Sequence, residues 1–326
     1  MEFLRASTLQ APIAALAWLG RQGTRAMTAL VFAGIALPPV GALLKPFVPE
    51  AVFVLLCTAF LRLDMTVLRG HLRRPAVVAT ATIWSTMVLP VLFGLGCLAG
   101  GIDVRSPDLF LGLMLQATTS PMMAAPALAA LMGLDATLVL VALIATSALT
   151  PLTAPVLVYL FAGEALSLSP LTLGLKLLGM LIGSALLALI VRRFVSLESI
   201  RRHKAEIDGF NVLVLFVFVS AVMGGVAGQF AAAPMATLGL TVFAFFVFFV
   251  VLGLTMLCLA WAGRKRALAL GLMASQRNLG LMLAVTGGAL PDLTWLYFAL
   301  SQFPIYLTPQ LLEPLARRLG AQERSE

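Results

Sequence analysis

Two short polar stretches interrupt long apolar runs of this 326-residue chain. The first is Gln116-Ala-Thr-Thr-Ser-Pro121 and the second is Ser275-Gln-Arg-Asn-Leu-Gly280. Their hydroxyl, amide and guanidinium groups are strong hydrogen-bonding groups that can hold a small polar or anionic molecule. We expect the substrate-binding residues to be Thr118, Thr119, Ser120, Pro121, Gln276, Arg277 and Asn278.

Arg277 carries the strongest single signal for function. It lies about ten residues into an apolar run, and an arginine at that depth usually faces a cavity or a partner. The alternative is that the run begins later and that Arg277 belongs to the basic loop of Arg264, Lys265 and Arg266. Removing residues 267–277 would leave a very short span, which favours the buried interpretation.

Proline interrupts the first polar stretch and its surroundings. Pro121 and Pro126 each remove a helical hydrogen bond, and unwound backbone in a membrane survives only where it is buried or lines a cavity. Two breaks in matching positions indicate a transport site, because the new helix ends can hold ions and substrate. The alternative is that Pro121 only kinks its helix.

Three further polar residues, Thr146, Thr150 and Gln302, are weaker candidates for lining a cavity. Thr146, Thr150 and Thr153 share one helical face. Threonines that hydrogen-bond to the carbonyls of their own helix are an equal alternative.

The composition places these stretches in a membrane. Hydrophobic residues make up 61% and charged residues 11% of the chain, whereas soluble domains carry about 25% charged residues. The three cysteines lie in apolar runs without metal-ligand spacing, so neither disulfides nor a zinc site is expected. The sequence contains no cluster of acids, histidines or metal ligands, so an enzyme is not expected. It also contains no phosphate-binding loop, so an ATP-driven pump is not expected, and no cofactor is indicated.

The apolar runs predict an all-α polytopic protein of about ten transmembrane helices. Of its 22 basic residues, 18 fall on one side if both termini are cytoplasmic, as the positive-inside rule requires. The net charge of +8 then meets anionic lipid headgroups, and no nucleic-acid partner is expected. The expected spans are 26–44, 48–67, 76–99, 108–132, 136–161, 170–191, 209–229, 235–262, 267–290 and 293–315.

Ten spans divide into two five-helix halves of opposite orientation, an inverted repeat found in many secondary transporters. The expected parts are a cytoplasmic or interfacial segment 1–25, a first repeat 26–161, a second repeat 162–315 and a cytoplasmic tail 316–326. The fourth and ninth spans are the broken helices and are expected to cross.

Several motifs resemble those of the bile acid:sodium symporter family, whose superfamily includes arsenite efflux carriers. They are Leu61-Arg-Leu-Asp-Met with Leu72-Arg-Arg-Pro75, the Ser120-Pro121 break with Asp135, Thr150-Pro151-Leu-Thr-Ala-Pro155, and Arg277-Asn278-Leu-Gly280-Leu. The resemblance covers roughly residues 30–315. It implies a panel of spans 1, 2, 6 and 7, a core of spans 3–5 and 8–10, and two sodium ions behind the crossing.

The chain departs from the family at the implied sodium ligands. Aligned without gaps, those positions hold Ala125 and Pro126, Val139 and Leu143, and Met273, while Arg277 stands where the family has a glutamine. Sodium requires hard oxygen ligands, which the aliphatic and methionine side chains do not offer. We therefore hypothesise that Arg277 is a built-in positive charge that favours an anionic substrate without requiring sodium.

The sequence thus predicts a secondary transporter of a small organic anion, working by alternating access in the inner (plasma) membrane of a bacterium. The alternatives are a sodium-coupled symporter of bile-acid-like or carboxylate substrates and a membrane sensor that binds without transport. The resemblance implies that arsenite carriers use a cysteine in the fourth span. This span contains none, so arsenite efflux is disfavoured. The partners expected are the lipid bilayer and the substrate, and no motif indicates an oligomeric state.

Overall fold

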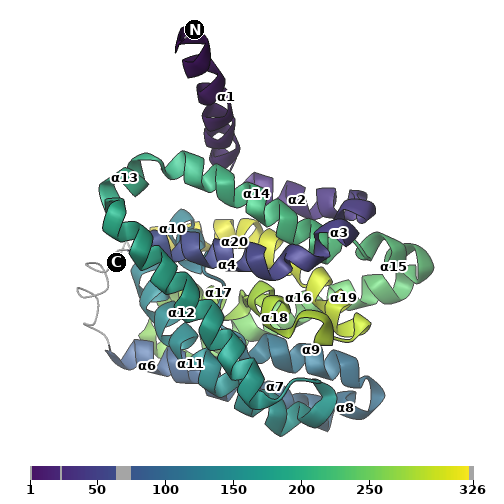
Figure 1. The fold of residues 1–326 in the computed structure, drawn as a ribbon. Coiled ribbons are helices and arrows are strands. Elements are labelled where there is room, and N and C mark those ends of the chain that lie inside the picture. Colours follow the sequence, from purple (N-terminus) through teal and green to yellow (C-terminus); the bar gives the residue numbers. More distant parts are fainter. Residues whose placement is uncertain (1, 23, 64–74, 323–326) are drawn as a thin grey trace. The chain divides into compact units, whose positions relative to one another are not determined.

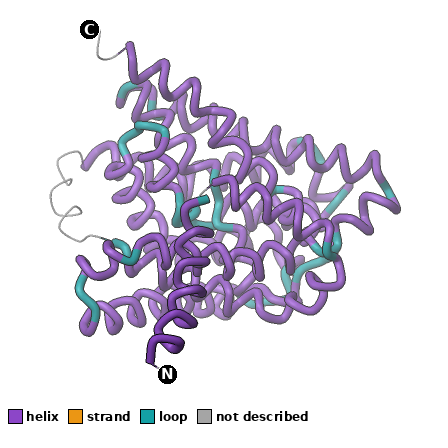
Figure 2. The backbone as a smooth tube through the Cα atoms, turned by 90° about the horizontal axis from the view of Figure 1, so that it is seen from above, coloured by secondary structure: helices purple, strands orange, loops and turns teal. Residues whose placement is uncertain are grey.

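The computed structural model describes residues 2–22, 24–63 and 75–322. Helices make up nearly all of this part of the chain, joined by short loops, and no strand is present in it (Figure 1, Figure 2). Some residues named above lie outside the described ranges, namely Asp64, Met65, Leu72, Arg73 and Arg74.

Six helical segments among the described residues are long and apolar enough to cross a membrane. The prediction of an all-α, membrane-embedded chain is therefore confirmed, while ten spans and their orientation stay a prediction. The six segments are Pro38–Leu61, Pro75–Ala99, Ala136–Ala162, Pro170–Phe194, Lys204–Ala232 and Pro234–Cys258.

The chain divides into two compact units. The first unit comprises residues 1–63 and 181–228, and the second comprises residues 64–180 and 229–326. The boundaries fall within α12 (Pro170–Phe194) and α15 (Val226–Ala232), so each of these helices contributes to both units.

The first unit is built around α14 (Lys204–Met223), which contacts α1 (Glu2–Arg21), α2 (Thr24–Ala36), α3 (Pro38–Leu44) and α4 (Val48–Leu61). Its remaining short helix is α13 (Leu197–Arg202), capped by the Ser196 hydroxyl. Close packing against α14 depends on glycine. A Cβ built on Gly41 would lie 2.4 Å from the Ser220 carbonyl oxygen, so a larger residue has no room there.

The first two expected spans divide at a different residue from the one predicted. The chain leaves the helical conformation at Leu37 (φ −122°, ψ 59°) and then remains helical from Pro38 to Leu61 through the 3₁₀ turn η1 (Lys45–Phe47). The expected interruption between residues 44 and 48 was therefore wrong. Leu37 precedes a proline, which disfavours the α conformation, whereas Pro46 lies in the first turn of η1, where its missing N–H is tolerated.

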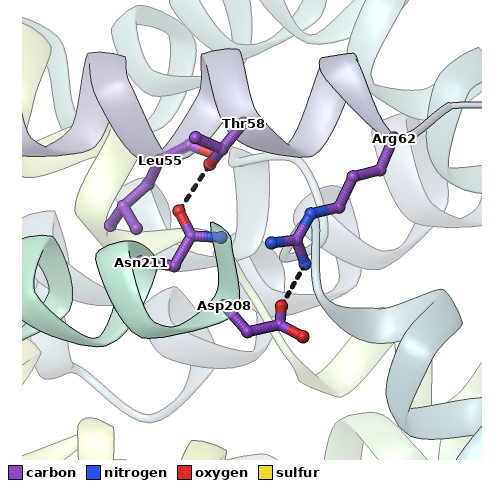
Figure 3. Close-up of polar contacts among 5 residues, drawn as sticks. All are labelled: Leu55, Thr58, Arg62, Asp208 and Asn211. Atoms are coloured by element: carbon purple, nitrogen blue, oxygen red, sulfur yellow. Dashed lines mark hydrogen bonds and ion pairs between the residues drawn. The ribbon is translucent and has the colours of Figure 1, made fainter. Parts of the chain in front are cut away.

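Two polar contacts fix the register of α4 against α14 (Figure 3). The Thr58 hydroxyl donates to the side-chain oxygen of Asn211 at 2.7 Å, and one turn further the Arg62 guanidinium pairs with Asp208 at 2.5 Å. The two charged side chains are 32% and 28% exposed, so water screens their attraction. The pair therefore contributes more to register than to stability.

The second unit contains both polar stretches. Its first series is α6 (Pro75–Ile83), the π-helical turn η2 (Trp84–Val88), α7 (Leu89–Ala99), α8 (Ile102–Arg105), α9 (Pro107–Thr118), α10 (Ala125–Leu131), α11 (Ala136–Ala162) and the turn η3 (Gly163–Ala165). Its second series is α16 (Pro234–Cys258), the turn η4 (Ala260–Ala262), α17 (Arg264–Ser275), α18 (Leu279–Thr286), the turn η5 (Gly287–Ala289), α19 (Asp292–Leu300) and α20 (Gln302–Gln322). Buried apolar side chains from α6, α10, α11, α16 and α17 form its main core.

Candidate functional site

Both polar stretches break their helices. After α9 ends at Thr118, helix resumes only at Ala125, and after α17 ends at Ser275 it resumes at Leu279. The two breaks lie against each other as a short antiparallel bridge that pairs Pro121 with Arg277. The alternative that Pro121 only kinks a continuous helix is therefore wrong.

The bridge is reciprocal in its hydrogen bonds. The Met122 N–H donates to the Gln276 carbonyl at 2.7 Å, and the Asn278 N–H donates to the Ser120 carbonyl at 2.8 Å. Each break thus satisfies backbone groups that the other leaves without a helical partner. Because an unsatisfied backbone group in hydrocarbon costs several kcal/mol, each unwound segment stabilises the other.

The Arg277 side chain is 2% exposed, among the largest fully buried side chains of the described chain. Its guanidinium donates to the Thr119 carbonyl at 2.8 Å and, from both terminal nitrogens, to the Ser85 carbonyl at 3.4 Å. Its Nε has no partner, and no described carboxylate pairs with it. Arg277 is therefore an uncompensated buried cation, and the basic residues Arg264–Arg266 lie at the opposite end of α17.

The Ser85 carbonyl is available to Arg277 because of the local backbone. In the π turn, the Leu89 N–H bonds to Trp84 instead of Ser85. The next residue, Pro90, has no N–H to offer. The carbonyl of Ser85 therefore lacks a helical donor. Arg277, which lies between α17 and α18, supplies one.

A second freed carbonyl meets the neighbouring residue, Gln276. Pro309 lies four residues after Ile305 in α20 and has no N–H, so the Ile305 carbonyl has no helical donor. The Gln276 amide nitrogen donates to that carbonyl at 3.3 Å. The Gln276 side-chain oxygen and the hydroxyl of nearby Thr308 are both buried without a partner, so they have unused hydrogen-bonding capacity.

The other candidate residues of the breaks hold the backbone. The Thr118 hydroxyl bonds to the Met114 carbonyl of its own helix at 2.8 Å. The Thr119 hydroxyl donates across the bridge to the Asn278 carbonyl at 3.2 Å. The Asn278 side-chain oxygen caps α18 by accepting from the Leu281 N–H, and Ser120 contributes its carbonyl to the bridge.

The weaker candidates donate hydrogen bonds to carbonyls one turn earlier in the chain. The Thr146 hydroxyl donates to the Ala142 carbonyl at 2.7 Å, and the Thr150 hydroxyl donates to the Thr146 carbonyl at 2.9 Å. The Gln302 amide donates to the Phe298 carbonyl at 3.2 Å. All three candidates are buried. The bonds of the two threonines match the alternative in which they satisfy their own helix, whereas Gln302, at the start of α20, bonds to the preceding helix α19.

Two buried contacts near the breaks involve residues that the sequence did not single out. The Tyr297 hydroxyl of α19 donates to the Gln116 side-chain oxygen, at the start of the first polar stretch. The Trp84 indole donates to the Thr255 hydroxyl at 2.9 Å, which joins the π turn to α16. Buried aromatic residues with a polar group usually find a partner, but a tyrosine or tryptophan in an apolar run does not identify which one.

The positions that the family resemblance gives to sodium ligands have apolar side chains, and all but the partly buried Pro126 are tightly packed. Ala125, Val139, Leu143 and Met273 are each at most 1% exposed and belong to the same core cluster. Sodium needs oxygen ligands, so these side chains do not fit the ion. No group of three or more metal-binding side chains occurs within the described ranges.

A separate cavity of about 340 Å³ lies between α6 and α11, and none of the candidate substrate-binding residues lines it. Its walls are almost entirely apolar, and Thr82 is the one lining residue with a polar side chain. Its lining residues are Pro75, Val78, Ala79, Thr82, Ile83 and Ala145.

Comparison of the chain with protein-family models and with curated protein sequences finds no match. The helix breaks, the buried charge and the packing of the second unit are therefore the features that bear on its function.

Proposed function

We propose that the protein is a secondary transporter that moves a small organic anion across the membrane by alternating access. The observation that supports this most strongly is the buried guanidinium of Arg277, which belongs to one of two helix breaks that hydrogen-bond to each other and has no carboxylate partner among the described residues. Ionisable residues inside membrane segments usually mark substrate or ion pathways.

The electrostatics of the breaks favour an anion. The α18 helix begins at Leu279, directly after Arg277 and its capping neighbour Asn278. The partial positive charge of a helix N-terminus adds to that of the guanidinium. An anionic substrate would supply both with the counter-charge that the described side chains do not provide.

The organisation of the chain is compatible with alternating access. The second unit holds residues 76–161 and 235–315, the spans expected in the core, and the first unit holds those expected in spans 1, 2 and 7 of the panel. Ten spans, an inverted repeat and cytoplasmic termini complete the proposed architecture, in the inner membrane of a bacterium. Each interrupted helix is the fourth of its proposed half, which is how inverted-repeat transporters build a central site.

The first experiment is a thermal-shift screen of the purified protein with pyruvate, succinate, benzoate and taurocholate, each in sodium and in choline buffer. A ligand at 100 times its dissociation constant stabilises by about 2.7 kcal/mol. Anions that stabilise the protein then enter uptake assays in proteoliposomes. A sensor that binds without transport would show stabilisation and no flux.

The charge-neutral variant Arg277→Gln tests the site, with Lys176→Gln as its matched control. Lys176 lies on α12 with an exposed side chain, so removing its charge is expected to leave uptake unchanged. Arg277→Gln is expected to fold and to lose anion stabilisation and uptake. Normal uptake by well-folded Arg277→Gln would disprove the proposed site.

A further inference from the structure

We infer that the Arg277 guanidinium is a built-in cation that takes the place of a coupling metal ion, so that the site binds its anion without sodium. This inference rests on the proposed function, because only a transporter has a coupling ion. Three observations support it: the carbonyl acceptors around the guanidinium, the packing of the neighbouring core, and the unpaired donor groups at Arg277 and Ser85.

The acceptors of Arg277 are ones that otherwise suit a metal cation. Thr119 follows the last residue of α9, where the negative end of the helix dipole and unbonded carbonyls attract positive charge. The Ser85 carbonyl has no helical donor because of the π turn and Pro90. In broken-helix transporters, such carbonyls coordinate the coupling ion. Here a covalently attached cation already binds them, at 2.8 and 3.4 Å.

The surrounding side chains provide no second cation position at the places implied by the family resemblance. Val139 and Leu143 of α11 and Met273 of α17 fill that region with apolar atoms at 0–1% exposure. A metal ion there would lose its hydration shell without gaining oxygen ligands, which is unfavourable. The positive charge of the second unit's centre is thus fixed to the chain at Arg277.

The guanidinium still has capacity for an anion. Its Nε and the Ser85 hydroxyl are both buried without partners, and the two 3.4 Å bonds to the Ser85 carbonyl are long. Long hydrogen bonds are weak, so an anion oxygen can replace that carbonyl at little cost while the 2.8 Å bond to Thr119 is kept. A carboxylate would then meet the resident cation directly, as a metal-bridged substrate would in a sodium-coupled site.

Two equilibrium measurements on the full-length purified protein test the inference. The first is binding of radiolabelled sodium ion to the wild type, which we expect to show no saturable component. The second is rescue of Arg277→Ala by methylguanidinium ion at millimolar, non-denaturing concentration. Truncation empties the cation position while keeping its carbonyl acceptors, but a guanidinium buried there without an anion is costly. We therefore expect methylguanidinium to restore to Arg277→Ala the rise in Tm that a stabilising anion of the panel causes, and to leave that rise unchanged in the wild type and in Lys176→Ala.

The outcomes separate this inference from the proposed function. Saturable sodium binding to the wild type would overturn the inference while leaving a transporter intact. Failure of methylguanidinium to restore the anion-dependent rise in the Tm of Arg277→Ala would also overturn it. If that variant does not fold, Arg277→Lys replaces it, and wild-type-like anion stabilisation in choline buffer is expected, while a new requirement for sodium would contradict the inference. Absence of anion flux through the wild-type protein in proteoliposomes would instead reject the proposed function.

Discussion

Replacement of Arg277 by methionine separates a functional charge from a structural anchor. Methionine is of similar length and lacks the charge and the donors. If Arg277 is a structural anchor, its replacement is expected to destabilise the protein strongly. If Arg277 serves substrate binding, its replacement is expected to leave the stability unchanged or to increase it, because functional sites often reduce stability.

The structure gives the magnitude of each contribution. The Thr119 carbonyl would lose its 2.8 Å bond, and a buried acceptor without a donor costs about 1–3 kcal/mol. The Ser85 carbonyl would lose two 3.4 Å contacts, which at that length contribute about 0.5–1 kcal/mol at most. Against this, a buried ion without a counter-charge costs several kcal/mol. We expect Arg277→Met to range from neutral to about 2 kcal/mol more stable.

The assay is thermal unfolding in detergent, followed by the fluorescence of the four tryptophans. One kcal/mol moves the Tm by about 2 °C in a chain of this size. The control is Arg266→Met, which removes a partly buried arginine that bonds to the Ala262 carbonyl. This control is expected to change stability by no more than about 0.5 kcal/mol and to keep its response to anions, whereas Arg277→Met loses that response.

A fall in Tm of more than about 6 °C for Arg277→Met, equivalent to roughly 3 kcal/mol, would refute this reasoning. Such a fall would mean that the hydrogen bonds to the two carbonyls outweigh the desolvation of the charge. Arg277 would then hold the breaks together, and its burial would no longer indicate a bound anion.

Two further variants test the packing on which the site depends. Tyr297→Phe is expected to destabilise by about 1–3 kcal/mol because the buried Gln116 oxygen loses its donor; adding Gln116→Leu is expected to recover much of this in a double-mutant cycle of thermal unfolding. Gly41→Ala places a Cβ 2.4 Å from the Ser220 carbonyl oxygen and is expected to lower stability by about 1–3 kcal/mol. Its control, Gly239→Ala, has nothing within 4 Å of the new Cβ and is expected to keep or raise the Tm.

The sequence predicts the helix breaks because their chemistry is local. Pro121 removes a helical hydrogen bond in a polar stretch, and Arg277 is costly in lipid without a partner. Both facts are visible in the residues themselves, and the structure breaks both helices there. The boundary at Leu37 was equally local, since two prolines follow it, but the expected spans 26–44 and 48–67 placed the division at Lys45–Phe47, where the structure has a 3₁₀ turn.

The roles of the short polar side chains could not be predicted in the same way. A threonine in a helix can line a cavity or donate to the carbonyl one turn earlier, and its sequence context is the same in both cases. Thr150 takes the second course. Asn278 caps α18, a role that depends on where the helix starts, and helix starts are the least certain part of a sequence-based prediction.

The long-range pairing of Arg277 with Ser85 depends on tertiary structure, yet one half of it was visible in the sequence. A proline inside a helix leaves an acceptor without a donor one turn before it, so Pro309 marks the carbonyl of Ile305. Pro90, together with the π turn, likewise marks Ser85. Buried acceptors require donors, and the second polar stretch supplies two adjacent ones, Gln276 and Arg277. In this chain, Pro90 and Pro309 therefore mark the carbonyls to which the guanidinium of Arg277 and the amide of Gln276 bind. The donor groups that remain unpaired after these bonds form, such as the Nε of Arg277, indicate where a substrate can bind.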